Sequence, residues 1–161
     1  YVKDNYHLNK KYLYEVYSRD FTINTVHIDI ESGSFIDPTR RGLEDIGKNI
    51  ISCVIGAEPC FSDQPQRIFR CLKFAVKYNM NIDDEIIKVL DNRNFNSVKM
   101  KVDKRYSARV INYCMKLNPD LCIDLIYKMK LSNYININGE LKKYLLKEKR
   151  IIEFMDRQKY E

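Results

Sequence analysis

The alternation of apolar and polar residues predicts β-structure early in the chain. Apolar and polar residues alternate from Thr25 to Ile30, Ser32-Gly33 supplies a turn, and residues 34–37 continue in an extended pattern. This succession is typical of a β-hairpin. A short helix at about 42–49 and a buried strand at 50–55, ended by Gly56 and Pro59, are predicted to follow it.

Helical periodicity replaces the strand pattern after about residue 61. Ser62 is the predicted N-cap of a helix with Pro65 in its first turn, and apolar residues recur at helical spacing as far as Val76. We expect the opposite side of this helix to meet solvent or phosphate, because it carries Arg67, Arg70, Lys73 and Lys77. Further helices are predicted at about 83–91, 103–117, 120–130 and 139–160, with Asn118-Pro119 separating two of them.

These patterns predict an α+β fold in two parts, with β-structure and a short helix in residues 1–60 and helices alone in residues 61–161. The 161 residues are enough to bury a core. No apolar run approaches the roughly 20 residues that a membrane span needs, which excludes a membrane protein. The chain begins at Tyr1 rather than Met, so we expect an upstream portion or leader.

Positive charge accumulates in the second half of the chain. Residues 1–90 hold 12 Lys and Arg against 13 Asp and Glu, whereas residues 91–161 hold 16 against 9. Such asymmetry suits a polyanionic partner, because Lys and Arg that neutralise phosphates release counterions. A solvated lysine-rich surface is the alternative that charge alone leaves open.

The five cysteines favour packing over metal binding. They form no C-x-x-C pair, and the chain has only two histidines, so the sequence predicts no zinc site. An odd number of cysteines within apolar patterns indicates reduced, buried thiols and an intracellular compartment, either the cytoplasm or a mitochondrion or other organelle.

Five motifs in order resemble the class II tRNA nucleotidyltransferases and bacterial-type poly(A) polymerases. The segment 19–24 reads R-D-F-T-I-N, the turn 36–38 reads I-D-P, and the helix 42–46 reads G-L-E-D-I. The segment 61–75 resembles the family's F-x-E-D-P-x-R-x-L-R-A-x-R-F-A, and 102–105 resembles its V-S-x-E-R. The likeness covers roughly residues 15–125, and each motif alone would be weak.

The resemblance implies a remnant of a mixed-sheet nucleotidyltransferase head in residues 1–60 and an RNA-binding helical neck and body in residues 61–161. A nucleotide-transfer site needs cationic donors for the triphosphate, a task that suits Arg19, and groups that bond the base edge. In the family an acidic pair and an Arg perform the second task. The implied nucleotide-binding residues here are Arg19, Asp20, Asp63, Gln64, Arg67 and Arg70, and the expected RNA-binding residues are Lys73, Lys77, Lys104, Arg105, Arg109, Lys142, Lys143 and Lys147.

Three positions depart from the family pattern. Ser18 replaces the first Arg of R-R-D, Gln64 replaces the second carboxylate of E-D, and Arg109 occupies an acidic position in the helix that begins near Arg105. A neutral amide both donates and accepts hydrogen bonds, whereas a carboxylate only accepts, so base selection is expected to change or to be lost.

The family's metal-binding carboxylates stand in a G-G…D-x-D segment upstream of R-R-D, and residues 1–18 contain no such segment. We therefore expect no catalytic or metal-ligating residue in this chain and no nucleotide transfer by it alone. Mg²⁺ and ATP or CTP are expected only if an N-terminal head portion completes the site. Asp29 and Glu31 have D-x-E spacing, but they follow the R-D-F-T block, and we interpret them as turn residues.

Structural roles compete with functional ones at several residues. Asp20 and Asp45 would serve equally as caps of local turns or helices, Asp37-Pro38 as a turn device, and Arg67 as a surface ion-pair partner.

Three functions stay open at the level of sequence. The first is the RNA-binding portion of an enzyme that adds nucleotides to RNA 3′ ends, by CCA or poly(A) addition. The second is a non-catalytic family member that binds tRNA-like or ribosomal RNA in a ribonucleoprotein, such as a mitochondrial ribosome, among other proteins. The third is a protein-interaction module.

Overall fold

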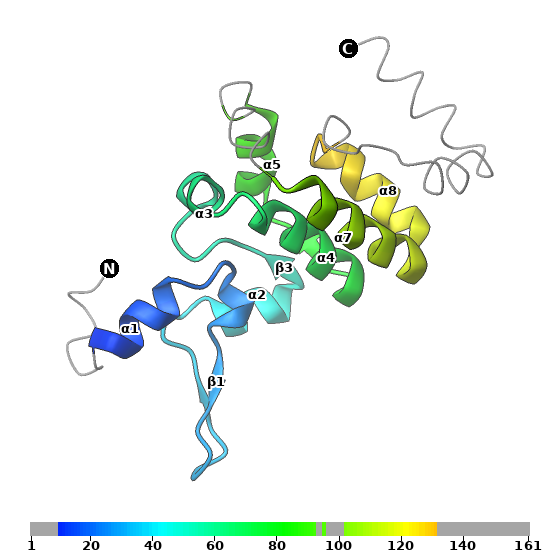
Figure 1. Cartoon of the computed structure of the whole chain (residues 1–161). Coiled ribbons are helices and arrows are strands. Elements are labelled where there is room, and N and C mark those ends of the chain that lie inside the picture. Colours follow the sequence, from blue (N-terminus) through cyan, green and yellow to red (C-terminus); the bar gives the residue numbers. More distant parts are fainter. Residues whose placement is uncertain (1–9, 93–94, 96–101, 132–161) are drawn as a thin grey trace, which may run out of the picture.

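The computed structural model describes residues 10–92, 95 and 102–131, in which small β-elements precede a group of packed helices (Figure 1). The predicted α+β fold is confirmed. The predicted helix at 139–160 lies outside the described residues.

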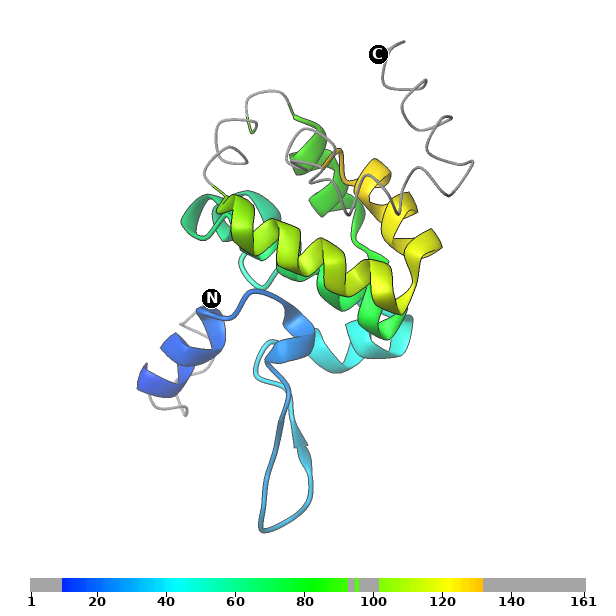
Figure 2. The same ribbon diagram turned by 45° about the vertical axis from the view of Figure 1, so that its right-hand side comes forward.

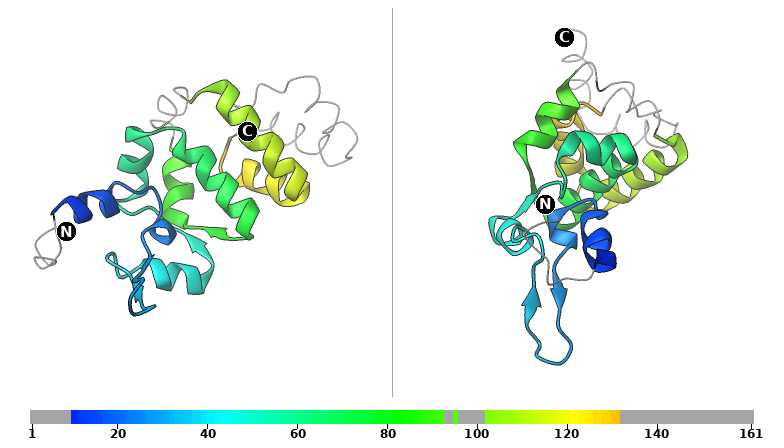
Figure 3. Two further views of the ribbon diagram at one scale, coloured as in Figure 1. Left: turned by 60° about the horizontal axis from the view of Figure 1, so that its bottom comes forward. Right: turned by 90° about the vertical axis from the view of Figure 1, so that its left-hand side faces the viewer.

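The predicted hairpin is present and projects from the rest of the protein (Figures 2 and 3). Helix α1 (Lys10–Tyr17) and a single 3-10 turn, η2 (Thr22–Asn24), lead into strands β1 (His27–Ile28) and β2 (Phe35–Ile36). The strands pair antiparallel, with His27 opposite Ile36. At the tip the Asp29 carboxylate accepts hydrogen bonds from the main-chain N–H of Glu31 and of Ser32, which confirms the turn role predicted for this acidic pair.

Helix α2 (Gly42–Lys48) follows the I-D-P turn. In its first turn the main-chain N–H of Leu43 donates a 2.9 Å hydrogen bond to the side chain of Asp37. A Cβ atom at Gly42 would lie 2.6 Å from a methyl group of Val26 and 2.7 Å from the carbonyl oxygen of Thr22, so only glycine permits this approach. The helix ends at Asn49, whose φ of 57° is left-handed. The predicted turn device at Asp37 is therefore also a helix cap.

The strand predicted at 50–55 is shorter than expected, because only β3 (Ile50–Ile51) pairs as a regular strand. Its partner is β4 (Asn81–Ile82), which runs parallel to it and which the sequence did not predict. After β3 the chain stays buried through residues 52–54, and its main chain forms hydrogen bonds with the segment 20–22. Thr22 N–H donates to the Ser52 carbonyl, and Val54 N–H donates to the Asp20 carbonyl.

The predicted N-cap at Ser62 is wrong, because two helices stand where one was expected. Ser62 lies inside α3 (Ala57–Asp63), and α4 (Arg67–Tyr78) begins only after a break at Gln64-Pro65-Gln66. Pro59, interpreted from sequence as the end of a strand, occupies the first turn of α3, where its missing N–H has no partner to lose.

The starts of the three remaining helices agree closely with the predictions. Helices α5 (Asp84–Asp91), α7 (Lys104–Leu117) and α8 (Pro119–Lys128) begin after Asp83, Asp103 and Asn118, whose side chains accept main-chain N–H groups of the first turn. These bonds use donors that a helix start leaves without partners. At Asp103 they lower the pKa of the carboxyl group, and Tyr106 N–H makes the largest contribution.

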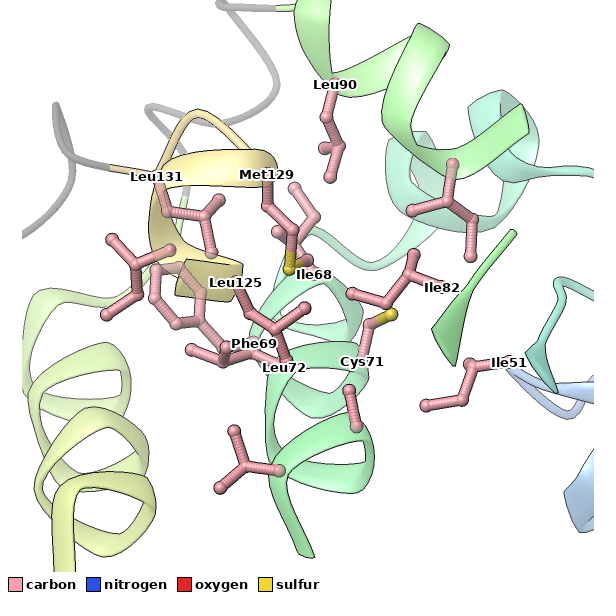
Figure 4. Packing of buried hydrophobic residues seen from close by; sticks show 14 of the residues in the cluster. Ile51, Ile68, Phe69, Cys71, Leu72, Ile82, Leu90, Leu125, Met129 and Leu131 are labelled. Atoms are coloured by element: carbon pink, nitrogen blue, oxygen red, sulfur yellow. The ribbon is translucent and has the colours of Figure 1, made fainter. Parts of the chain in front are cut away.

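One hydrophobic cluster joins both parts of the chain, from Phe21 to Leu131. Figure 4 shows its centre, where Phe69 and Leu72 of α4 meet Leu125 of α8 and Met129, the residue that follows this helix. All five cysteines are buried and unbridged, as predicted, and burial raises the pKa of the Cys71 thiol. None of the helices in the described part of the chain combines the length and the apolar character that a bilayer crossing requires.

Candidate functional site

A cleft of about 690 Å³ lies between α1 and the junction of α3 with α4. Three of the six candidate nucleotide-binding residues, Asp63, Gln64 and Arg67, line it, although α3 ends at the first of them and α4 begins at the last. Because the break between the two helices turns these side chains toward α1, a carboxylate, an amide and a guanidinium share one concave surface. Such a set can both donate to and accept from the edge of a nucleobase.

Arg67 is buried at the cleft, with 8% of its surface exposed. Its Nη2 donates to the Ser18 carbonyl at 2.7 Å, and its Nη1 donates to the Cys60 carbonyl at 3.4 Å. The same Nη1 lies 3.6 Å from the Asp63 carboxylate. The prediction that Arg67 lies on the solvent side of its helix is wrong, because the last turn of α3 and the end of α1 cover the first turn of α4.

Asp63 and Gln64 are exposed, in contrast to Arg67. The Asp63 side chain keeps 65% of its surface accessible despite its ion pair, so an exposed carboxylate faces the cleft. Arg67 is thus a fixed wall of the cleft, while its two neighbours are accessible to a ligand.

Asp20 and Arg70 form a separate, adjacent pair. The Asp20 side chain is only 4% exposed and accepts from Arg70 Nε and, at 2.8 Å, from Asn24 Nδ2. Neither residue lines the cleft. These bonds support the structural alternative for Asp20, because they hold the start of η2 against α4.

Arg19, the candidate phosphate donor, is exposed and pairs with Glu15 one helical turn earlier at 2.7 Å. It is not among the residues that line the cleft. Asp45, for which a local helix role was weighed, lies in the first turn of α2 and accepts a 2.6 Å hydrogen bond from the hydroxyl of Thr22.

Of the remaining cleft residues, Ser18 was named from the sequence only as a departure from the family pattern, and Leu13, Tyr14, Tyr17 and Ile55 were not predicted. Tyr14 keeps 80% of its surface exposed, so its ring is accessible at the cleft. The spacing of Tyr14 and Tyr17 on an amphipathic segment just before the R-D-F-T block was the available signal.

The candidate RNA-binding residues Lys73, Lys77, Lys104, Arg105 and Arg109 lie on α4 and α7, two helices that pack against each other. Neither Arg105 nor Arg109 forms an ion pair with another described residue. The other three candidates, Lys142, Lys143 and Lys147, lie outside the described residues.

Within residues 10–92, 95 and 102–131 there is no group of three or more His, Cys, Asp or Glu side chains placed to hold a metal ion. Asp29 and Glu31 are no exception, since main-chain donors of Ser32 and then Glu31 take up the Asp29 carboxylate and lower its pKa. The described residues therefore do not fit a catalytic Mg²⁺ pair, which needs clustered carboxylates.

The chain is similar in sequence to members of one protein family. The family model described as Poly A polymerase head domain matches residues 3–52. The tRNA nucleotidyltransferase cca1 of Schizosaccharomyces pombe is 42% identical over 74 residues, which cover 46% of this chain and 15% of that protein. The mitochondrial CCA tRNA nucleotidyltransferase of Saccharomyces cerevisiae is 29% identical over 119 residues, 73% of this chain and 22% of that protein. The chain belongs to the class II tRNA nucleotidyltransferase family.

The fold agrees with this membership. The CCA-adding enzyme of Bacillus stearothermophilus, solved in complex with CTP, superposes with a TM-score of 0.67 at 22% identity over 81% of this chain and 33% of the enzyme. The chain spans 15% and 22% of the lengths of the two fungal relatives. The family membership predicted from the five motifs is confirmed.

Proposed function

We propose that this chain supplies the base-recognition and RNA-binding part of an enzyme that adds nucleotides to the 3′ ends of tRNA or a tRNA-like RNA. The convergence of Asp63, Gln64 and Arg67 on one cleft carries the proposal. In this proposal, residues 1–60 are the end of a nucleotidyltransferase head, and residues 61–161 are the helical neck and body that follow it. The pairing of β3 with β4 and the shared core make the two parts one unit.

Asp63, Gln64 and Arg67 of the cleft, and Arg19 outside it, have distinct roles in this proposal. The exposed Asp63 carboxylate accepts from a base amino group, and the Gln64 amide both accepts and donates. Arg67 is a positioning residue, because its short bond to the Ser18 carbonyl fixes the cleft wall next to them. Arg19 binds the triphosphate after exchanging its exposed partner Glu15 for phosphate, an exchange that costs little in an exposed pair.

The catalytic carboxylates belong, in this proposal, to a part of the head outside the described residues. The hairpin supports it, since Ile28, Ile30 and Phe35 expose large apolar side chains on a two-stranded ribbon. Ribbons of this kind are marginal alone and are stabilised by further strands. The remaining strands of the head are the proposed cover, and the head-domain match over residues 3–52 supports this choice.

The proposed nucleotides are CTP and ATP. Relatives of the same fold have been solved with ATP and with CTP. The described residues do not form a Mg²⁺ site. No metal-dependent step of the reaction is therefore assigned to the described residues. The five buried, reduced thiols and the mitochondrial S. cerevisiae relative support a cytoplasmic or mitochondrial location.

Calorimetric titration of the full chain with CTP, ATP and GTP tests the cleft. We expect Gln64→Ala to weaken CTP or ATP binding by about 3- to 10-fold, the range of one neutral hydrogen bond. Gln66→Ala is the matched control, because this exposed glutamine is two residues away and does not line the cleft. Equal effects of the two substitutions would contradict the assignment of Gln64.

Filter binding of a tRNA that lacks its terminal CCA tests the RNA-binding role. If four to six phosphates are contacted, log K should fall against log salt with a slope of roughly −3 to −6. A flat response would refute RNA binding through this basic surface. RNA binding without any nucleotide binding would instead favour the non-catalytic ribonucleoprotein component.

A further inference from the structure

Helices α4 and α7 are unusually rich in positive charge, and except for Arg67 these cations lie outside the cleft. Each carries four Lys or Arg residues and no Asp or Glu. The two helices lie side by side (Figures 1 and 2). Among the described residues, the ion pairs that involve these cations are those of Arg67 and Arg70 at the start of α4, so the other cations keep their positive charge.

Aromatic rings alternate with these cations. Phe74 and Tyr78 stack on α4 with ring centroids 6.0 Å apart, and Arg70 Cζ lies 5.5 Å from the Phe74 centroid. Lys77 Nζ lies 4.7 Å from the Tyr78 centroid and donates to its hydroxyl at 3.0 Å. Lys73 Nζ of the same helix lies 5.5 Å from the ring centroid of Tyr113, which belongs to α7.

Lys77 contacts the Tyr78 ring, and Lys73 contacts the Tyr113 ring. The hydroxyl of Tyr78 is the main cause that raises the pKa of the Lys77 ammonium group, and Tyr113 adds to it. Tyr78 is 52% exposed and Tyr113 is 38% exposed, so both rings are accessible from solvent. A cluster of two accessible rings and two ammonium groups thus spans the two helices.

Stability alone does not account for this cluster. An exposed cation–π pair contributes little, and helix surfaces built for stability carry acidic partners three or four residues from each cation. An acidic protein partner would use the ammonium groups but would have no need of exposed ring faces. Bases stack on aromatic rings whatever their sequence, while the phosphates between them bind cations, so single-stranded nucleic acid uses both.

We propose that Tyr78 and Tyr113 are stacking platforms for the single-stranded 3′ end of the RNA, and that Lys73 and Lys77 bind its phosphates. This inference rests on the proposed function and adds the binding site. A base that stacks on Tyr78 displaces the Lys77 ammonium from the ring, and the ammonium then becomes available to the adjacent phosphate. Because α4 rises about 1.5 Å per residue, Tyr78 is roughly 16 Å along the helix from Arg67, which lines the cleft. A strand stacked there can therefore direct its end toward the nucleotide site.

Two RNA duplexes test this site with the full chain. One is an acceptor-stem hairpin with a four-nucleotide single-stranded 3′ tail, and the other is the same hairpin with a blunt end. We expect tighter binding of the tailed RNA in fluorescence anisotropy. Tyr78→Leu or Tyr113→Leu should weaken tailed binding by about 5- to 150-fold, the range for one base–aromatic stack, and should change blunt binding by less than about 2-fold.

Four controls separate stacking from folding and charge. Tyr78→Phe keeps the ring and should keep the preference for the tail, and Tyr127→Leu on α8 should leave it unchanged. Lys73→Gln with Lys77→Gln should flatten the salt dependence of binding, whereas the Tyr→Leu variants should not. Polyglutamate at equal charge should compete more weakly than tailed RNA.

The failures of the two proposals are distinguishable. Binding to neither RNA would refute the proposed RNA-binding function itself. Binding to both with a tail preference that survives both Tyr→Leu substitutions, or equal competition by polyglutamate, would overturn the stacking site alone.

Discussion

Substitution of Arg67 by Met removes the guanidinium while keeping an apolar stem of similar length, and the structure sets the expected cost. The 2.7 Å bond from Nη2 to the Ser18 carbonyl is charge-assisted, and its loss costs about 1.5–3 kcal/mol. The 3.4 Å bond to the Cys60 carbonyl is long, and the ion pair with the exposed Asp63 adds at most about 1 kcal/mol. We expect the free energy of unfolding to fall by about 2–3 kcal/mol and the midpoint of thermal unfolding to fall by about 4–12 °C.

Circular dichroism during urea and thermal unfolding of the full chain measures both quantities. Arg109→Met is the matched control, because this exposed arginine of α7 has no ion-pair partner among the described residues and should change the unfolding free energy by less than about 0.5 kcal/mol. Arg67→Lys should be intermediate, since one ammonium group replaces a fork that reaches two carbonyls. If Arg67→Met is as stable as the wild type, the structural role of Arg67 is refuted.

Three further substitutions test the fold and its response to acid. Gly42→Ala should destabilise the chain by at least about 1 kcal/mol, because its Cβ would overlap a carbonyl oxygen and a methyl group. Gly47→Ala in the same helix has open space around its Cβ and should stabilise by about 0.5 kcal/mol; equal urea midpoints would contradict this reasoning. Since the pKa of Asp103 is lowered in the folded state, its contribution is present above the unfolded pKa of about 3.9 and is lost as the pH falls through the folded value. Asp103→Asn keeps an N-cap that does not titrate, so its urea midpoint should fall less than that of the wild type between pH 5 and about pH 3; identical falls would exclude the effect.

Local chemistry explains which elements the sequence predicts well. The starts of α5, α7 and α8 are specified by cap residues such as Asp103 and Asn118 that bond to N–H groups two or three residues away. Strand β4 was missed because it is two residues long and its pairing with β3 depends on contacts 31 positions away in sequence. Helix α3 was missed because Pro59 and Gly56 resemble a strand end unless the following turn is seen to be helical.

The same distinction applies to the cleft. Asp63, Gln64 and Arg67 lie within five positions of one another, so a single sequence motif is enough to group them. Tyr14 and Tyr17 join them only because the chain just after α1 is bonded to Arg67 through the Ser18 carbonyl, a contact that no local pattern records. The burial of Arg67 has the same origin. Helical spacing groups it with Arg70, Lys73 and Lys77, but the covering elements reach only the first turn of α4.

Two anchors on successive turns of α4 hold the segment that carries Arg19. Arg67 bonds the carbonyl of Ser18, and Arg70, three residues later, pairs with the buried carboxylate of Asp20. The residue between these two contacts is the exposed Arg19, so its position is set from both sides by one helix. In the two proposals the same helix contributes Arg67 to the nucleotide cleft and Tyr78 to the RNA surface. Movement of α4 would then displace the triphosphate donor, the Arg67 wall of the cleft and the Tyr78 stacking platform together, because Arg67 and Tyr78 belong to α4 and the Arg19 segment is bonded to it.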